Sequence, residues 1–318
     1  MLEICAGAGG QSSGLERAGF RHVCLVEHDR DAAATLRLNR PEWDVAEQDV
    51  RLFDASSFQG VSLLAGGVPC QPFSAAGLRL GADDERDLFP AALDMVDTVR
   101  PDAVMFENVK ELATTRFAAY REAVLDRLGQ MGYVARWRLL RADEHGVPQS
   151  RTRLVIVALR PQSAARFRWP EPLDAPAPTV GETLRALMGE RGWSGADAWA
   201  DRADRVAPTI VGGSKKHGGA DLGPTSTRKT WLAFGVDGRS VADEAPGPDV
   251  PADGLVRLTC PMAARLQGFD PGWRFVGRKT SVYRQIGNAF PPPVAERVGR
   301  AILDALSGEA PPPRTEKK

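Results

Sequence analysis

Residues 2–20 read LEICAGAGGQSSGLERAGF, an apolar run followed by a glycine-rich turn and a segment with helical spacing. Gly7, Gly9 and Gly10 occupy the turn. Because glycine has no side chain, a ligand could approach the backbone there and reach the first amides of the helix. The pattern predicts a strand, a ligand-binding loop and a helix at the start of an α/β domain, with an ordinary tight turn as the alternative.

Apolar runs continue along the chain and alternate with helix-like segments up to about residue 159. Two of these segments, residues 93–99 and 120–131, have the apolar spacing of helices packed on a sheet. This order predicts a doubly wound, mostly parallel α/β sheet. Four further runs are apolar enough to be strands buried on both faces: residues 22–27, 61–67, 102–108 and 153–159.

The composition and the periodicity of the sequence change after Arg160. A proline-rich stretch is followed by a glycine-rich, weakly periodic region up to about residue 255, which predicts a linker and a smaller irregular domain. Helical spacing returns only at residues 291–306. We therefore divide the chain into a large domain (1–160), a small domain (161–280, variable over 165–255), a segment returning to the large domain (281–308) and a tail (309–318).

The 318 residues include 41 Lys and Arg and 41 Asp and Glu, so the formal net charge is zero. Any nucleic-acid surface must therefore be a local patch. No apolar run is long enough to cross a bilayer and no leader-like segment follows Met1, so we expect a cytoplasmic protein. The four cysteines are too scattered for a zinc site and too few for a disulfide framework, and no metal is expected.

The glycine-rich turn fits a nucleoside better than NAD or ATP. A dinucleotide fingerprint would need glycine at Ser12, and no Gly-Lys-Ser/Thr follows for a phosphate-binding loop. Glu27 ends the second predicted strand, twenty positions after Gly7, where an acidic side chain can accept hydrogen bonds from both ribose hydroxyls. The alternative is a solvated glutamate.

A cysteine loop, VPCQPFS at residues 68–74, follows the third predicted strand. It places Cys70 at the carboxyl end of a parallel strand, where open α/β sheets bind ligands. The two prolines that bracket Cys70 restrict the loop and favour a nucleophile held in one place. The alternative is a small buried hydrophobe, which is our interpretation of Cys5, Cys24 and Cys260.

Polar residues also end the next two predicted strands. Burial of Glu107 would raise its pKa and make it a general acid, with a helix cap as the alternative; Asn108 follows it. Alternation along a strand would put Gln149, Arg151 and Arg153 on one face. Two guanidinium groups there suit a phosphate or a carbonyl oxygen, whereas isolated arginines more often form surface salt bridges.

In chain order, these features resemble the DNA (cytosine-5)-methyltransferase family. The glycine loop resembles its cofactor motif, and the motif holding Cys70 resembles its Pro-Cys nucleophile motif. Two positions depart from the family: Cys5 replaces a usual aromatic residue and Met262 a usual glutamate. The other matching blocks are VEHD (26–29), QDV (48–50), ENV (107–109), QSRTR (149–153), RLTCPMAARLQGF (257–269) and YRQIGNAFPPPVA (283–295).

The resemblance implies methyl transfer from S-adenosylmethionine, leaving S-adenosylhomocysteine, to a cytosine flipped out of double-stranded DNA. It implies that Cys70 attacks C6 and Glu107 donates a proton to N3. Arg153, with Arg151, would hold the base carbonyl or a phosphate, and Asn108 would support the Cys70 loop. The implied cofactor-binding residues are Cys5, Ala6, Gly7, Ala8, Gly9, Gly10, Glu27, His28, Asp49, Val50, Gly67, Pro69, Leu88, Asn288 and Ala289.

The DNA-facing patch is expected within residues 207–228, which combine a Lys-Lys-His cluster with flexible glycines. A solvated loop is the alternative. We expect a monomer of the bacterial restriction-modification type, with a cognate restriction endonuclease as a possible partner. The expected DNA-binding residues are Gln71, Ser74, Gln149, Lys215, Lys216, His217 and Arg228.

Three other functions are open at this point. A tRNA cytosine-5 methyltransferase would keep the chemistry, but the Cys-Phe-Thr feature of that branch is missing near Glu107. A catalytically silent DNA-binding regulator would not need Cys70, Glu107 and Arg153. A cysteine hydrolase would need a histidine base, for which His145 is the candidate by chain position.

Overall fold

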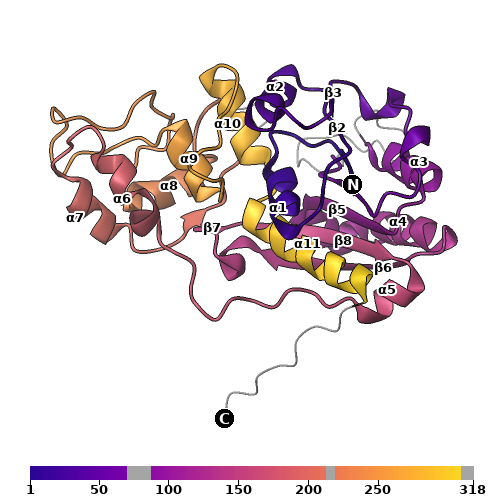
Figure 1. The fold of residues 1–318 in the computed structure, drawn as a ribbon. Coiled ribbons are helices and arrows are strands. Elements are labelled where there is room, and N and C mark those ends of the chain that lie inside the picture. The colour runs from indigo at the N-terminus through magenta and orange to yellow at the C-terminus, as the bar shows by residue number, and fades with distance from the viewer. Residues whose placement is uncertain (70–86, 213–218, 309–318) are drawn as a thin grey trace, which may run out of the picture.

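The computed structural model describes residues 1–69, 87–212 and 219–308, which form two lobes (Figure 1). The larger lobe holds a seven-stranded sheet in the order β3-β2-β1-β4-β5-β8-β6. Neighbouring strands are parallel except at β8, which runs antiparallel to β5 and β6. The prediction of a doubly wound, mostly parallel sheet is confirmed. The strands are β1 (Leu2–Ile4), β2 (Cys24–Val26), β3 (Val45–Ala46), β4 (Leu63–Gly66), β5 (Ala103–Val109), β6 (Val134–Arg141) and β8 (Thr152–Leu159).

Helices cover both faces of the sheet, which explains why its strands are apolar without alternation. On β5, Val104 and Phe106 join the core under α3 (Phe89–Val99) and α4 (Ala118–Gln130). Ala103 and Met105 join the opposite core, under α1 (Gly10–Ala18), α11 (Pro292–Ser307) and α5 (Pro161–Arg166). Figure 1 shows α1 and α11 side by side on this second face.

Two strands of the sheet were not expected from the sequence. β3 has two residues, too few to show a period. β6 has eight, but it is an edge strand, and arginines on its exposed positions interrupt the apolar pattern. A separate two-stranded sheet pairs β7 (Gln149–Ser150) with β9 (Ala207–Pro208).

The smaller lobe contains more helix than the sequence predicted, and the expectation that helical spacing returns only at residues 291–306 is wrong. Its helices are short, so each holds too few turns for periodicity to stand out among the surrounding glycines and prolines. The Thr-x-x-Glu signature of a capping box is present at Thr179 and Glu182 and could have located the first of them. They are α6 (Val180–Gly189), α7 (Ala196–Arg202), α8 (Thr225–Ala233) and α9 (Cys260–Leu266).

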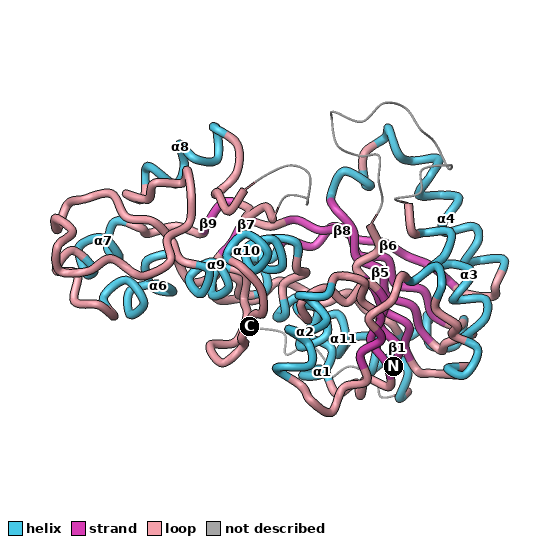
Figure 2. Tube along the Cα trace, turned by 90° about the horizontal axis from the view of Figure 1, so that it is seen from above, coloured by secondary structure: helices cyan, strands magenta, loops and turns pink. Residues whose placement is uncertain are grey.

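Two helices lie on the side where the lobes meet, α10 (Lys279–Asn288) and α2 (Arg30–Asn39) (Figures 1 and 2). Thr35 on α2 donates a hydrogen bond of 2.8 Å to Gln285 on α10. Short 3₁₀ turns complete the large lobe: η1 (Val50–Leu52), η2 (Ser56–Phe58), η3 (Lys110–Ala113), η4 (Thr115–Phe117) and η5 (Ala142–His145).

The chain leaves the large lobe after α5, whose Ala164 and the following Phe167 belong to the core beneath α11. The sequence boundary at residue 160 stays a prediction. Within the described ranges, no helix is both long and apolar enough to span a membrane.

Candidate active site

The glycine-rich loop after β1 is closed by the carboxylate of Glu27 at the end of β2. Glu27 is buried, and its two oxygens accept hydrogen bonds of 2.7 Å from the backbone amides of Gly7 and Asp29. Gly7 has a left-handed φ of 57°, and no described atom lies within 4 Å of a Cβ built on it. The loop therefore presents open space beside a fixed carboxylate, as the nucleoside interpretation requires.

Segments from the far end of the chain pack against the same loop. A Cβ on Gly9 would lie 2.6 Å from the indole of Trp273, and one on Gly10 would lie 2.8 Å from the Cβ of Ala289. Trp273 also donates a 3.0 Å hydrogen bond from Nε1 to the carbonyl of Ala8. Contact with the C-terminal half thus explains Gly9 and Gly10. Trp273 was not predicted, because nothing local marks an indole whose partner lies 265 residues away.

Two further residues of the predicted cofactor set are polar. His28 follows Glu27 directly, and Asp49 follows Gln48, whose amide donates to the carbonyl of Glu27. His28 is largely exposed, and its Nδ1 lies 3.2 Å from Glu27 Oε1. Asp49 begins η1, and hydrogen bonds from the side chain and backbone of Arg51 hold its pKa down at about 2. Asp49 is thus an anion at neutral pH, next to the buried Val50.

The backbone of Cys5 has a left-handed φ of 50°, a conformation that favours glycine. The residue as a whole is partly exposed, but desolvation of its thiol raises the pKa, so the thiol stays protonated at neutral pH. Cys24 is buried, as expected of a core residue, whereas Cys260 is partly exposed. Leu88, another predicted cofactor residue, packs with Cys5 on the core beneath α3.

A nearly buried ion pair lies where β5 ends and β8 begins. Arg153 Nε lies 2.8 Å from Glu107 Oε1, and the two side chains are 14% and 10% exposed. A Cβ built on Gly67 would lie 3.4 Å from the other carboxylate oxygen, so Glu107 sits over the residue after β4. Burial raises the pKa of Glu107, and Arg153 opposes this rise in part. A carboxyl group that readily holds a proton is therefore fixed beside a guanidinium.

Asn108 fastens the segment that leads to Cys70. Its Nδ2 donates a 2.8 Å hydrogen bond to the carbonyl of Val68, and its Oδ1 accepts one from the amide of Val109. The amide of Leu88 donates to the carbonyl of Pro69, which joins the described chain on either side of residues 70–86. Cys70, Gln71 and Ser74 themselves lie outside the described residues.

Gln149, Arg151 and Arg153 do not share one set of partners. Gln149 and Arg151 are fully buried and bind other segments of the chain. Arg153 is the member of the three that pairs with Glu107. The roles of Gln149 toward DNA and of Arg151 toward substrate stay predictions.

The expected DNA patch is described in part. Lys215, Lys216 and His217 lie outside the described residues. Arg228 is half-buried in α8, and within the described chain its Nε has no hydrogen-bond partner. His145, the candidate base of a hydrolase, is buried in η5, where desolvation lowers its pKa to about 4.

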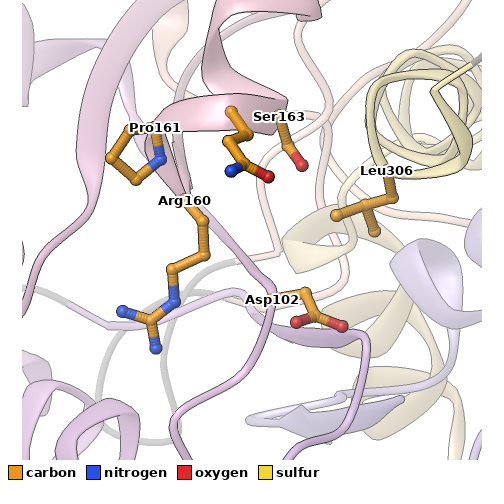
Figure 3. Close-up of a pocket in the computed structure, with 6 residues that line it drawn as sticks. Asp102, Arg160, Pro161, Ser163 and Leu306 are labelled. Atoms are coloured by element: carbon orange, nitrogen blue, oxygen red, sulfur yellow. The ribbon is translucent and has the colours of Figure 1, made fainter.

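A cavity of about 570 Å³ lies at the ends of β5 and β8 that point away from the Glu107–Arg153 pair (Figure 3). Asp102 precedes β5 and Arg160 follows the antiparallel β8, whereas Asn108 and Arg153 occupy the other ends of these strands. Arg160 donates to the carbonyl of Met131, and none of the predicted site residues lines this cavity. It is therefore separate from the candidate site. Its lining residues are Asp102, Arg160, Pro161, Gln162, Ser163 and Leu306.

Comparison with known proteins covers nearly the whole chain. The model of the family "C-5 cytosine-specific DNA methylase" matches residues 1–304. The Type II methyltransferase M.NaeI of Lentzea aerocolonigenes is 58% identical over 313 residues, covering 97% of this chain and 76% of that protein. The Type II methyltransferase M.NgoMIV of Neisseria gonorrhoeae is 48% identical over 315 residues, covering 97% and 98%.

Solved structures share the fold at low sequence identity. The Entamoeba histolytica methyltransferase EhMeth superposes with a TM-score of 0.67 at 16% identity, covering 96% of this chain and 98% of that one. The S. pombe Dnmt2 methyltransferase superposes with a TM-score of 0.64 at 19% identity, with coverage of 96% and 98%. These two likenesses bear on the fold alone.

Proposed function

The chain belongs to the C-5 cytosine-specific DNA methylase family, and on this premise we propose which of its residues carry out the reaction. The observation that carries the proposal is the buried Glu107–Arg153 pair, which lies over Gly67 and next to the Asn108 anchor of the segment leading to Cys70. An acid, a cation and the residues that precede Cys70 thus meet where β4 and β5 end.

The chemistry requires these groups because C5 of cytosine is a poor nucleophile. Addition of the Cys70 thiolate to C6 forms a sulfur–carbon bond and pushes electrons toward N3, where Glu107 delivers its proton. The enamine so formed is nucleophilic at C5, which gains the methyl group. Loss of the C5 proton to solvent then re-forms the C5–C6 double bond and expels the Cys70 thiolate, and the N3 proton returns to Glu107.

Two neighbouring residues support these steps. Arg153 holds the carboxyl group of Glu107 through Nε and donates from Nη1 to the carbonyl of Thr152, and its Nη2 suits the carbonyl oxygen of the base. Asn108 keeps Val68 at a fixed position, two residues before the nucleophile. Holding the reacting groups in place removes much of the entropy cost of bringing them together.

The glycine-rich loop and its surroundings fit S-adenosylmethionine, which supplies the electrophilic methyl group and leaves as S-adenosylhomocysteine. Glu27 would accept hydrogen bonds from the ribose hydroxyls, as its fixed place beside the open space at Gly7 suggests. Asp49 and Val50 would bind the adenine, and Asn288 and Ala289 would close the pocket from the C-terminal side.

The substrate is a cytosine of double-stranded DNA, which must leave the stack to be reached. Arg228 and the residues around 215–217 would bind the DNA. Because two similar proteins carry the name Type II methyltransferase, we propose that this chain acts in the cytoplasm of a bacterium, beside a cognate restriction endonuclease. We propose a monomer because the reaction takes place on one strand of the duplex.

The test is transfer of labelled methyl from S-adenosylmethionine to mixed-sequence duplex DNA by the wild type and by Cys70→Ala. We expect label at C5 of cytosine within one short motif, located by bisulfite sequencing, and no label with the variant. The same assay is run with tRNA. If tRNA is labelled and DNA is not, the substrate is RNA and not DNA. Cofactor binding without transfer to either would favour a silent regulator.

A further inference from the structure

Arg151 holds two segments of the chain that are far apart in sequence. Its side chain is 1% exposed, so its charge must be satisfied inside the protein. One terminal nitrogen donates to the carbonyl of Ile210 and the other to the carbonyl of Gly287, each at 2.8 Å. Ile210 follows β9, and Gly287 lies in the last turn of α10.

The two segments cross in direct backbone contact at this point. A Cβ built on Gly287 would lie 2.5 Å from the Cα of Gly212, and one on Gly212 would lie 2.6 Å from Oδ1 of Asn288. Any side chain larger than hydrogen at either glycine would therefore separate the segments. The Arg151 hydrogen bonds and the glycine crossing together fix one position of each segment relative to the other.

A second buried network joins the same segments. The amide of Ile210 donates to Oε1 of Gln149 at 2.9 Å, and Nε2 of Gln149 donates to Oε1 of Gln267 at 2.7 Å. Gln267 in turn donates from Nε2 to the carbonyl of Ala289 at 2.5 Å. Movement of either segment would leave buried polar groups without partners, which is costly.

Each segment leads directly into a different proposed binding region. Gly212 immediately precedes residues 213–218, where DNA contacts are expected. Asn288 and Ala289 follow Gly287, and the Cβ of Ala289 packs against Gly10 in the cofactor loop. The crossing therefore lies between the proposed DNA surface and the proposed cofactor pocket.

We propose that Arg151 is a positioning residue that couples cofactor binding to DNA binding by holding the Gly212–Gly287 crossing. The inference rests on the proposed function. Both terminal nitrogens of Arg151 are already bound to backbone carbonyls, and within the described chain its buried Nε has no partner, which distinguishes it from the substrate-facing Arg153. A ligand that stabilises one segment then stabilises the bound position of the other.

The test measures the affinity for S-adenosylhomocysteine by calorimetry, with and without a duplex carrying the sequence that bisulfite mapping identifies. For the wild type we expect DNA to tighten this affinity on the order of 5- to 100-fold. Arg151→Met and Gly212→Ala should bring this ratio close to 1, where each ratio is taken against the variant's own affinity without DNA. Arg151→Lys, which can still donate to one carbonyl at a time, should keep part of the ratio.

Arg121 provides the matched control. It is also buried, donates to the backbone carbonyl of Leu112, and has a buried Nε without a partner in the described chain, but it lies in α4 on the far side of the sheet. Arg121→Met should lower the melting temperature and leave the affinity ratio unchanged. If Arg151→Met fails to fold, Gly212→Ala and Arg151→Lys decide the question.

Three outcomes would overturn the inference: an unchanged ratio in folded Arg151→Met and Gly212→Ala, an equal loss in Arg121→Met, or a wild-type ratio of 1. All three outcomes are judged only after the wild type has been shown to methylate DNA, so they leave the proposed function intact. A wild type that binds S-adenosylhomocysteine but transfers no methyl to DNA would instead contradict the proposed function.

Discussion

At the scale of single residues, the pairing of Glu107 with Arg153 determines what the site can do. The carboxyl group is nearly buried, and burial raises its pKa above that of an exposed glutamate. The 2.8 Å contact with Arg153 also fixes the orientation of the Glu107 carboxyl group. A proton donor that is both oriented and easily protonated is what N3 of the base requires.

Glu107→Gln should therefore remove the acid while keeping the shape of the side chain. We expect kcat to fall about 10²- to 10⁴-fold, the usual contribution of a general acid. The Kd for S-adenosylhomocysteine should change little, because the side chain does not hold the cofactor loop. Steady-state kinetics and calorimetry measure the two quantities, and Glu122→Gln on the exposed face of α4 is the control.

The pH dependence of the rate shows which protonation state of Glu107 the reaction needs. The acid form is needed, so the rate should fall as pH rises through the raised pKa of Glu107, at higher pH than for an exposed glutamate. This descending limb should be missing from the Glu107→Gln profile. The same limb in both proteins would show that another group supplies the proton.

The replacement of a usual glutamate by Met262 is accommodated at the start of α9. Thr259 accepts a hydrogen bond from the amide of Met262, and the sulfur of Met262 accepts one from the amide of Thr259 at 3.4 Å. The thioether thus takes the place of a carboxylate in a capping box, and α9 forms despite the substitution.

At the scale of elements, the fit of α1 against α11 brings the cofactor loop and the C-terminal segment together. A Cβ on Gly14 would meet the carbonyl of Pro292 and lie 2.7 Å from the Cβ of Ala295. Small residues on the facing surfaces let the two helices pack at short range. The position of the loop therefore depends on a helix nearly 300 residues away in the chain.

Gly14→Ala tests this packing, because two effects of opposite sign compete. Alanine favours the helix by about 1 kcal/mol, whereas forcing α1 away from α11 costs roughly 1–3 kcal/mol or more. We expect a lower free energy of unfolding in urea. Gly129→Ala in α4, where a Cβ meets no described atom within 4 Å, should raise stability by up to about 1 kcal/mol. Equal effects at both glycines would contradict the packing argument.

At the scale of the whole molecule, one apolar core runs through both lobes. Trp199 and Trp231 of the small lobe belong to the same cluster as Tyr283 on α10 and as Ala33 and Leu36 on α2. Because these residues share one cluster, unfolding of either lobe would expose apolar surface on the other. The two lobes should behave as one cooperative unit.

We therefore predict a single unfolding transition, at which the amides of β5 and of α7 lose their protection against hydrogen exchange together. S-adenosylhomocysteine at 100 times its Kd should raise the free energy of unfolding by about 2.7 kcal/mol as measured in either lobe. Two separate transitions, or protection of β5 without α7, would show that the lobes are independent.

Much of this molecule could be predicted from local sequence. The apolar runs at β1, β2, β4, β5 and β8 predicted the sheet. These strands are buried on both faces, so each is a continuous apolar run that stands out in the sequence. Other elements left weaker signals. The arginines of the edge strand β6 mask its pattern, and the small-lobe helices have at most ten residues.

The chemical groups of the site could be read from local sequence: a glycine turn after β1, an acid at the end of β2, and Glu107 and Asn108 at the end of β5. These follow from residue types and their places on strands, which are local properties. Tertiary structure alone decided which groups meet: Trp273 over Gly9, Arg153 on Glu107, and Arg151 on Ile210 and Gly287. Such contacts join residues 46 to 264 positions apart, and their partners are chosen by the packing of the whole core and not by neighbours in the chain.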